Sequence, residues 1–304
     1  MRDGIWLVPH EDAGKPSTDS KMPPKITTGN IASITRPRPF LRWAGGKFYL
    51  TDALLAFTPP DAHCRRYFEP FLGAGTLFFA LGHPRARLSD LNGHLIDCYR
   101  AIRDEPAAVA RQLRGHARND SESFYYRVRN EYNRSRSGTS RASRFLYLNR
   151  TGFNGVFRVN RQGRYNVPYG RQAKRARFPS TRELVEISDL LRRSRLKVQD
   201  YCAALEDTKA GDFVYLDPPY PPLNGTSFFT HYTADRFAID QQRRVSDCVR
   251  DLHRRGCLVM ISNADTPVIR KLYKGFRVSR LSVTRYVSSQ TVKHRVGEVI
   301  ITNY

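Results

Sequence analysis

The most constraining feature of the sequence is an apolar run, Phe213–Leu216, that stops at a double proline within Asp217-Pro218-Pro219-Tyr220. A short run of β-branched and aromatic residues predicts a buried strand, and proline ends its ladder because it has no N–H to donate. Ligands of open α/β sheets bind just beyond the carboxyl ends of the strands. The stretch therefore predicts a binding site at a strand end of an α/β sheet. A proline-rich turn that carries a solvated aspartate is the alternative.

The loop after this strand carries three groups that suit an exocyclic amino group on a flat base. Asp217 can accept one N–H of the amino group, the Pro218 carbonyl can accept the other, and the Tyr220 ring can stack on the base. Asp217, Pro218, Pro219 and Tyr220 are therefore the candidate site residues of this loop. Because short motifs give false positives, the rest of the chain must decide between a site and a turn.

A glycine pair stands between Trp43 and Lys47, in the stretch W-A-G-G-K over residues 43–47. Glycine lets the backbone approach a ligand closely, because it has no side chain. A turn that opens a helix over residues 49–56 is the simpler interpretation of the same residues.

A strand over residues 66–69, a glycine loop over residues 70–75 and a helix over residues 76–81 are expected next. This order is typical of a nucleotide-binding fold, but the third glycine of the dinucleotide fingerprint is absent. The pattern disfavours a nicotinamide dinucleotide and leaves room for a nucleoside that carries no phosphate.

Two further acidic residues stand at the ends of predicted strands. Asp90 follows residues 87–89, where doubly wound nucleotide-binding folds keep the acid that accepts hydrogen bonds from ribose hydroxyls. Asp90 could instead cap the helix that follows, and the two roles are compatible. Asp200 follows a strand over residues 196–199, and the next strand is the one that ends at Asp217.

The positive charge of the chain is concentrated in one third of its length. The formal net charge is +23, and residues 98–199 contain 24 Lys and Arg against 8 Asp and Glu. The guanidinium group binds phosphates and guanine edges through paired hydrogen bonds. A polyanion is therefore the expected partner, and nucleic acid is favoured over a basic surface that is merely solvated.

The α/β rhythm lapses over the same residues, which predicts an inserted domain. Helices are expected over residues 107–118 and 124–132, a Ser/Arg loop over residues 134–144, and an aromatic strand over residues 145–148.

The following stretch, residues 149–170, is predicted to form a hairpin that turns around Gln162 and Gly163. Its Arg, Asn and aromatic side chains can read base edges and wedge between bases. The residues expected to contact nucleic acid are Asn149, Arg150, Asn154, Arg158, Asn160, Arg161, Arg164, Tyr165 and Asn166. A basic hairpin that only packs on the core is the alternative.

The α/β rhythm resumes after the insert. The expected elements are a helix over residues 240–254, a strand over residues 258–261, a helix capped by Thr266, and an antiparallel edge pair over residues 276–284 and 298–304. A polar aromatic segment over residues 228–233 could close over a substrate.

Three features bear on the setting of the protein. Residues 1–35 show no sustained periodicity and predict a mobile tail. The five cysteines are scattered and lack zinc-ligand spacing, so we expect no metal site. No apolar run is long enough to span a membrane, and no secretory signal precedes the first domain, so the cytoplasm is the expected compartment.

Taken in order, the motifs resemble those of the Dam-type DNA adenine N6 methyltransferases, which are the alpha group of the D12 class. They are F-L-R-W-A-G-G-K, E-P-F-L-G-A-G, S-D-L-N, the N-R-T-G-F-N-G to N-V-P-Y-G hairpin, L-D-P-P-Y, S-F-F-T-H-Y-T to D-Q-Q, and I-S-N. The resemblance extends from about residue 39 to the C-terminus.

This resemblance implies a Rossmann-like, S-adenosylmethionine-dependent methyltransferase sheet with an inserted, mostly helical DNA-recognition domain that carries the hairpin. The methyltransferase domain would comprise residues 36–103 and 196–304, and the insert residues 104–195. The positions that match cofactor-contacting residues are Trp43, Lys47, Phe71, Gly73, Gly75, Asp90, Asp217 and, more loosely, Asp200.

The chemistry of such a reaction agrees with the residues of the chain. A sulfonium methyl group is already activated, so the protein needs no metal and no strong base, and its task is to position the acceptor. An adenine in duplex DNA must be flipped out before its amino group can reach the methyl group. Hydrogen bonds to Asp217 and the Pro218 carbonyl would aim the amino lone pair, and Tyr220 would replace the lost stacking.

Several alternatives stay open at this point. The same chemistry serves a cytosine N4 methyltransferase, and an RNA or protein amide substrate is conceivable. A catalytically inactive DNA-binding homologue is disfavoured because Trp43, Lys47, Asp90 and Asp217 are all present. The hairpin resembles that of GATC-methylating members, except that Val159 stands where they commonly have tyrosine. We expect a monomer that acts on double-stranded DNA.

Overall fold

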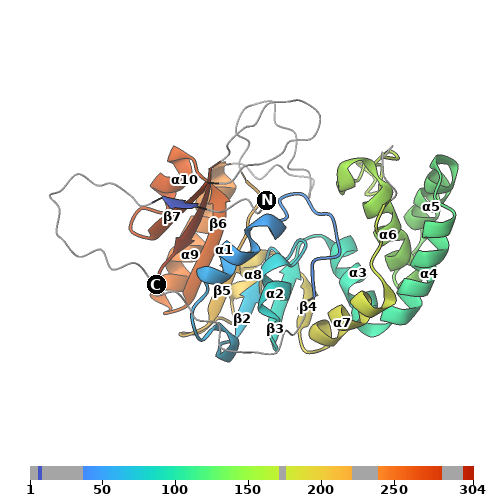
Figure 1. The fold of residues 1–304 in the computed structure, drawn as a ribbon. Helices are drawn as coiled ribbons and strands as arrows, with labels where there is room; N and C mark the ends of the chain where they lie inside the picture. Colours follow the sequence, from blue (N-terminus) through green and yellow to red (C-terminus); the bar gives the residue numbers. More distant parts are fainter. Residues whose placement is uncertain (1–5, 9–36, 171–175, 221–238, 283–296) are drawn as a thin grey trace.

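The computed structural model describes residues 6–8, 37–170, 176–220, 239–282 and 297–304. The described chain forms one mixed sheet in the order β1-β7-β8-β6-β5-β2-β3-β4 (Figure 1). The strands are β1 (Trp6–Val8), β2 (Tyr67–Glu69), β3 (Ala86–Asp90), β4 (Arg195–Val198), β5 (Phe213–Leu216), β6 (Leu258–Ala264), β7 (Arg277–Ser282) and β8 (Glu298–Thr302). The run from β6 to β4 is parallel, whereas β8 and β7 are antiparallel additions. The expected α/β class is confirmed.

The strand order reverses between β2 and β5. The chain passes from β2 to β3 and β4 on one side, and then crosses to β5 and β6 on the other side of β2. Because the strands are parallel, their carboxyl ends meet at one edge of the sheet, and ligands of doubly wound folds bind where the order reverses. The loops after β2 and β5 are therefore the ones that face each other across this crevice.

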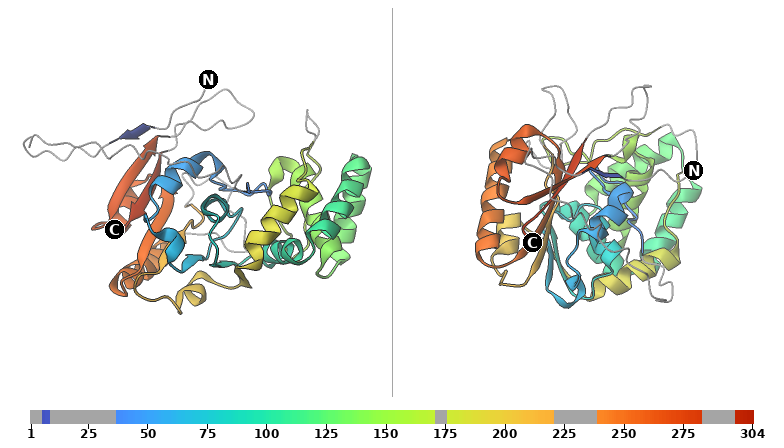
Figure 2. Two further views of the ribbon diagram at one scale, coloured as in Figure 1. Left: turned by 60° about the horizontal axis from the view of Figure 1, so that its bottom comes forward. Right: turned by 60° about the vertical axis from the view of Figure 1, so that its left-hand side comes forward.

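Both faces of the sheet are covered by helices, which explains why β5 is apolar at every position. Phe213 and Tyr215 pack on the face that carries α1 (Thr51–Ala56), α2 (Thr76–Leu81) and α3 (Gly93–Asp104). Val214 and Leu216 pack on the opposite face. That face carries α8 (Tyr201–Leu205), α9 (Ile239–Arg254) and α10 (Pro267–Leu272). Figure 2 shows the two layers on either side of the sheet.

The predicted insert is helical, as expected, and lies beside the β4 edge (right side of Figure 1). Its helices are α4 (Pro106–Arg118), α5 (Glu122–Arg134), α6 (Thr139–Thr151) and α7 (Thr181–Arg192). The prediction of a strand over residues 145–148 is wrong, because these residues lie in α6, which also shortens the predicted Ser/Arg loop. All four side chains are buried, since α6 packs against α3, α4 and α5. Burial on several sides removes the helical periodicity from the sequence.

The hairpin that follows α6 turns at the predicted place but contains no regular strand. Single bridges join Gly152 to Tyr169 and Val159 to Tyr165. The tip is closed by a hydrogen bond of 2.8 Å from the Asn160 N–H to the Arg164 carbonyl. Gly163 adopts a φ of +72° there, a conformation that suits glycine.

Two terminal expectations change. Residues Trp6–Val8 pair with β7, so a part of the predicted tail is a strand, and the rest of residues 1–35 lies outside the described residues. The predicted antiparallel pair is present, but β8 lies inside the sheet between β6 and β7.

The segment 228–233, which was expected to close over a substrate, lies outside the described residues. In the part of the chain that is described, no helix is both long enough and apolar enough to cross a membrane.

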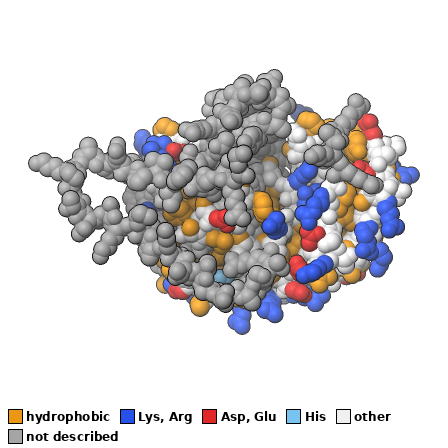
Figure 3. Space-filling model, in the orientation of Figure 1, with side chains coloured by type: hydrophobic (Ala, Val, Ile, Leu, Met, Phe, Trp, Pro, Cys, Tyr) orange, Lys and Arg blue, Asp and Glu red, His pale blue; other side chains and the backbone are white. Residues whose placement is uncertain are grey.

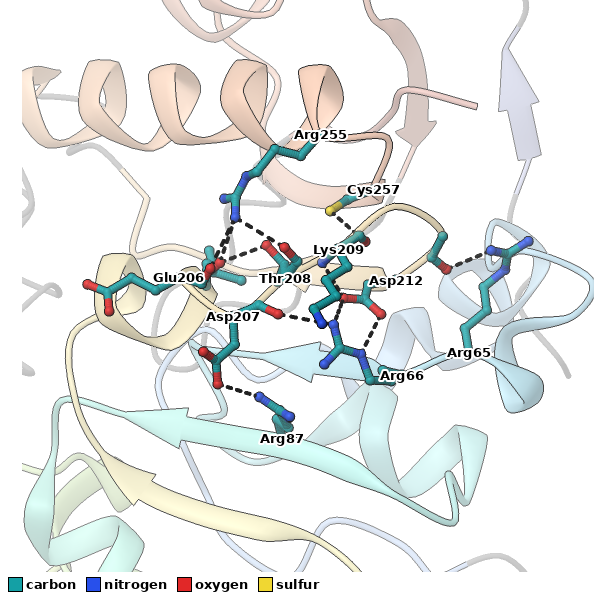
Figure 4. Close-up of polar contacts among 12 residues, drawn as sticks. Arg65, Arg66, Arg87, Glu206, Asp207, Thr208, Lys209, Asp212, Arg255 and Cys257 are labelled. Atoms are coloured by element: carbon teal, nitrogen blue, oxygen red, sulfur yellow. Dashed lines mark hydrogen bonds and ion pairs between the residues drawn. The ribbon is translucent and has the colours of Figure 1, made fainter.

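Arginines hold the loop before β5 at the edge of the sheet opposite the crevice (Figure 4). Arg66 donates to both carboxylate oxygens of Asp212, with an Nε to Oδ1 distance of 2.8 Å. One nitrogen of Arg255 donates to three carbonyl groups within residues 205–208, at 3.1 to 3.4 Å. These contacts fix the start of β5, so its carboxyl end is carried by a firmly held strand.

Candidate active site

Asp217 and Lys47 form an ion pair in the crevice beyond β5. The Lys47 Nζ lies 3.1 Å from Asp217 Oδ1 and 2.9 Å from the Gly45 carbonyl oxygen. Lys47 is 2% exposed and Asp217 is 20% exposed. The glycine pair before Lys47 and the proline loop, which are far apart in the sequence, therefore meet at this carboxylate.

Ser262 provides a second donor to the same carboxylate oxygen. Its Oγ donates to Asp217 Oδ1 at 2.6 Å and lies 2.9 Å from the Tyr215 hydroxyl. Ser262 lies on β6, next to β5, one residue beyond the pairing of Leu216 with Ile261. Among the described residues, none donates a hydrogen bond to Asp217 Oδ2. The carboxylate is thus held through Oδ1 and presents Oδ2 as an acceptor.

Tyr220 is fixed by contacts at its ring and at its hydroxyl group. The Lys47 Nζ lies 4.3 Å from the ring centroid, which is a cation–π distance. The hydroxyl donates to Glu298 Oε2 at 3.2 Å, and the Tyr49 hydroxyl donates to the other oxygen of Glu298. Glu298 is buried at the start of β8. Sequence alone gives Glu298 and Ser262 no role at the site, because their roles depend on which strands are neighbours.

The glycine loop after β2 lies against the Trp43 ring. Gly73 has a φ of +47°, and a Cβ atom at this position would lie 3.1 Å from Trp43 Cδ1. Gly75 has a φ of +67° at the start of α2, and a Cβ atom there would lie 3.0 Å from the Phe79 ring. Side chains other than glycine would be strained at both positions and would separate the loop from the residues that it approaches.

Asp90 holds the glycine loop against the end of β3. Its Oδ2 accepts from the Gly73 N–H at 3.0 Å, and its Oδ1 accepts from the Asn92 N–H at 2.9 Å. The alternative role as a helix cap is wrong, because Asn92 caps α3 by accepting from the Leu95 N–H. Burial raises the pKa of Asp90 to about 6, although the backbone N–H groups that donate to it favour the ionised form.

Phe71 and Asp200 lie at the same edge of the sheet. The Phe71 ring stacks on Tyr201 with centroids 5.1 Å apart. Asp200 caps α8 by accepting from the Cys202 N–H at 2.8 Å. Leu91, next to Asp90, is 55% exposed and places an apolar side chain at this edge, which no motif in the sequence indicates.

Glu69, the last residue of β2, is a buried acid close to Asp217. The Tyr67 hydroxyl donates to its Oε2 at 2.6 Å. Burial, and to a lesser degree the negative charge of Asp217, raise the pKa of Glu69 to about 8. Lys47, Asp217 and Glu69 therefore place one cation and two acids around the point where the strand order reverses.

The hairpin residues predicted to contact DNA fall into two groups. Asn154, Arg158, Asn160, Arg161 and Arg164 are exposed, and Asn166 is partly exposed. Within this group, Arg158 Nε donates to Asn166 Oδ1 at 2.9 Å, and Asn160 Oδ1 accepts from the backbone of Gln162 and Arg164.

The second group supports the hairpin from within. Asn149 is 4% exposed and binds the Arg42 backbone in both directions, at 2.9 and 2.6 Å. Tyr165 is 3% exposed, and Arg150 donates to the Phe40 carbonyl. The placement of Asn149 and Tyr165 favours a supporting role over the direct DNA contact predicted for them.

A cavity of about 350 Å³ joins the hairpin to the glycine loop. Trp43, Ala74, Arg150 and Asn154 are among its lining residues. Trp43 also stacks on Phe157 of the hairpin, with centroids 5.8 Å apart and an interplanar angle of 26°. The hairpin and the glycine loop therefore share one wall. In Figure 3, Lys and Arg side chains are spread over the right-hand part of the molecule, where the helical insert lies.

Comparisons with known proteins agree with this geometry. Residues 43–288 match the model of the D12 class of N6 adenine-specific DNA methyltransferases. The chain belongs to this class. It is 37% identical over 274 residues to the Type II methyltransferase M1.LlaDCHI of Lactococcus lactis subsp. cremoris, with 88% of this chain and 95% of the relative covered. It is 36% identical over 271 residues to the DNA adenine methylase of Escherichia coli K12, with the same coverage. The Type II methyltransferase M.MjaIII of Methanocaldococcus jannaschii is 33% identical over 288 residues, with 88% and 99% covered.

As a D12-class methyltransferase, the protein transfers a methyl group from S-adenosylmethionine to the N6 amino group of adenine in DNA. The predicted family, enzymatic activity and cofactor are thus confirmed. The class favours adenine in DNA over the cytosine, RNA and protein substrates that the sequence left open. S-adenosylmethionine supplies an already activated methyl group.

The residues at the crevice fit this cofactor. The close approach of Gly73 to Trp43 needs a position without a Cβ atom, and Asp90 offers a carboxylate at the strand end where ribose hydroxyls are bound in doubly wound folds. Within the described residues, no group of three or more His, Cys, Asp and Glu side chains could hold a metal ion.

Proposed function

We propose that the protein methylates adenine within GATC in duplex DNA, and that the base is flipped into the crevice between β2 and β5. The observation that carries this proposal is the state of Asp217. Its Oδ1 is held by Lys47 and Ser262, and its Oδ2 accepts from none of the described residues. An acceptor held in this way suits an N–H of an adenine amino group.

In this mechanism, Asp217 and the Pro218 carbonyl accept the two N–H groups of the amino group. These bonds draw the nitrogen lone pair out of conjugation with the ring and aim it at the methyl group. Asp217 acts first as a positioning and electrostatic group, because the amino proton becomes acidic only after attack. The flipped base stacks on the Tyr220 ring, which Lys47 and Glu298 hold in place.

The cofactor is assigned to the residues that line the crevice on the glycine-loop side. Asp90 accepts from the ribose, Gly73 and Gly75 bring the backbone close, and Trp43 and Phe71 provide aromatic surfaces. Lys47 and Asp217 border the reacting groups, and Asp200 lies toward the adenine of the cofactor. The placement of Asp90, Asp200 and Asp217 at one edge of the sheet supports this assignment.

The DNA is assigned to the basic hairpin and the insert, with residues 104–195 as the recognition domain and residues 36–103 and 196–304 as the catalytic domain. Arg158, Arg161 and Arg164 are exposed and can reach phosphates or guanine edges. Flipping a base leaves a gap that an apolar side chain can fill. Position 159 holds Val instead of an aromatic residue, and the neighbouring aromatic residues Phe157 and Tyr165 are both buried. Phe153 is 53% exposed at the base of the hairpin and is the better candidate.

The decisive experiment treats unmethylated genomic DNA with the purified protein and S-adenosylmethionine, followed by genome-wide mapping of N6-methyladenine. Digestion with nucleases that separate methylated from unmethylated GATC gives an independent readout. Modified adenine at GATC is expected. Methylation at another motif would reject GATC and leave the chemistry standing, whereas modified bases other than adenine would reject the mechanism.

A further inference from the structure

Strand β6 contacts the proline loop directly on one face of the sheet and through Gln242 of α9 on the other. Successive residues of a strand point to opposite faces. Ser262 reaches Asp217 on one face. Its neighbour Asn263 points to the other face and reaches Gln242 on α9. Gln242 lies outside the crevice and has no role in the mechanism described above.

Gln242 connects Asn263 to the backbone of the proline loop. Asn263 Nδ2 donates to Gln242 Oε1 at 2.9 Å, and Gln242 Nε2 donates to the Pro219 carbonyl oxygen at 2.8 Å. Asn263 Oδ1 accepts from the Ala264 N–H at 2.8 Å. Both amide side chains are 0% exposed. This arrangement fixes the direction of the Gln242 amide, because Asn263 donates to its oxygen and its NH₂ group must face Pro219.

The hydrogen bond from Gln242 to the Pro219 carbonyl restricts the position of the groups that would contact the adenine. Proline rings lock φ at two successive residues of the loop, so few backbone torsions remain free between Asp217 and Tyr220. Lys47 and Ser262 hold the loop at Asp217, and Gln242 holds it at the Pro219 peptide. The Pro218 carbonyl lies between these anchors, and Tyr220 follows directly.

We propose that Gln242, oriented by Asn263, is a positioning residue that sets the proline loop so that the Pro218 carbonyl and Tyr220 meet the adenine correctly. The inference rests on the roles proposed above for the loop. Gln242 touches neither substrate nor cofactor in this scheme. Its loss therefore changes the rate of methyl transfer, whereas the affinities for cofactor and DNA remain.

The first test is the variant Q242L, measured in single-turnover methyl transfer with saturating S-adenosylmethionine and a GATC duplex. The transfer rate should fall by about 10- to 100-fold, because a misplaced acceptor is no longer aligned for attack. Dissociation constants for cofactor and DNA should stay unchanged. Q241L is the matched control, since Gln241 is the neighbouring residue on α9 and its side chain makes no hydrogen bond to the described residues. Its rate should equal that of the wild type.

The second test is Q242E, which separates positioning from packing. Its carboxylate keeps an acceptor for Asn263 but turns an oxygen toward the Pro219 carbonyl, so the two acceptors repel each other. When the introduced carboxyl group is protonated, it can donate to Pro219 again. Burial raises the pKa of such a group. The ratio of the Q242E rate to the wild-type rate should therefore rise as the pH is lowered.

Three results would overturn the proposal: a wild-type rate in Q242L, a Q242E ratio that does not change with pH, or a rate loss that is matched by equal losses of both affinities. The last pattern marks a general packing defect. If Q242L folds poorly, the pH dependence of the Q242E rate tests the proposal instead, because Q242E retains the hydrogen bond from Asn263. If the wild type methylates no adenine, or if D217A remains active, the proposed function itself fails, whatever Gln242 does.

Discussion

The Lys47 ammonium lies 3.1 Å from Asp217 Oδ1, and this contact joins the glycine pair near the start of the chain to the proline loop more than half the chain away. Together with Ser262, it decides which oxygen of Asp217 is free to accept a hydrogen bond from the substrate.

Replacing Asp217 with Ala should lower methyl transfer by at least about 100-fold while the chain still folds, because the change removes an acceptor in a loop. Asp217→Asn should also fail. Its amide oxygen would face Lys47 and Ser262, so its NH₂ group would face the amino donor of adenine. Single-turnover methylation and circular dichroism check both points, and turnover at the wild-type rate in either variant would refute the role.

Ser262→Ala should slow methyl transfer by about tenfold, because it removes one of the donors that orient Asp217 Oδ1. Tyr215→Phe is the control, since it removes a hydroxyl that reaches Asp217 only through Ser262. Its effect should be smaller than that of Ser262→Ala, and an equal or larger effect would argue against the proposed order of contacts. The comparison requires rates at saturating cofactor and DNA.

Cofactor affinity should weaken as the pH falls through about 6, where Asp90 gains a proton. The protonated carboxyl group is a poorer acceptor for ribose hydroxyls, so binding is strong above this pH and weaker below it. Asp90→Asn should bind S-adenosylmethionine weakly and show little dependence on pH in this range. Calorimetric titrations across this range test the expectation, and a wild-type affinity that does not change would contradict it.

Glu69 should make the folded protein less stable as the pH rises. Its pKa is raised from 4.5 to about 8, so between these values the folded state binds a proton that the unfolded state has released. The free energy of unfolding therefore falls with rising pH over this interval. Glu69→Gln keeps an acceptor for the Tyr67 hydroxyl and cannot ionise. The melting temperature of Glu69→Gln minus that of the wild type should therefore increase as the pH approaches 8. A difference that stays constant at all pH values would contradict this prediction.

Truncating Arg164 or Arg158 to Ala should weaken DNA binding without changing cofactor affinity, because the hairpin lies outside the glycine loop. Arg164 is the cleaner test, since Arg158 also binds the Asn166 side chain and backbone. Each lost phosphate contact should reduce the slope of log affinity against log salt by about one unit. Wild-type binding that barely responds to salt would count against the hairpin as the DNA contact.

The sequence alone predicted the elements that local rules encode. A β-branched run before two prolines is a strand followed by a break, and acids after parallel strands lie at one edge of the sheet. Asp90, Asp200 and Asp217 could thus be placed together. The Gln162-Gly163 turn was also predictable, because turn chemistry is local. Residues 145–148 were predicted as a strand but lie in a helix. An element that is buried on several sides lacks the hydrophobic periodicity that distinguishes a helix from a strand.

The tertiary structure alone decided which side chains serve those elements. Ser262, Glu298 and Gln242 act on the proline loop because β6 and β8 are its neighbours and α9 covers the adjacent face. Asn149 looked like a base-reading residue in a basic hairpin, but it is buried against the Arg42 backbone. The physical reason is that backbone conformation follows from local sequence, whereas hydrogen-bond partners follow from strand order and register, which depend on contacts between segments that are far apart in the chain.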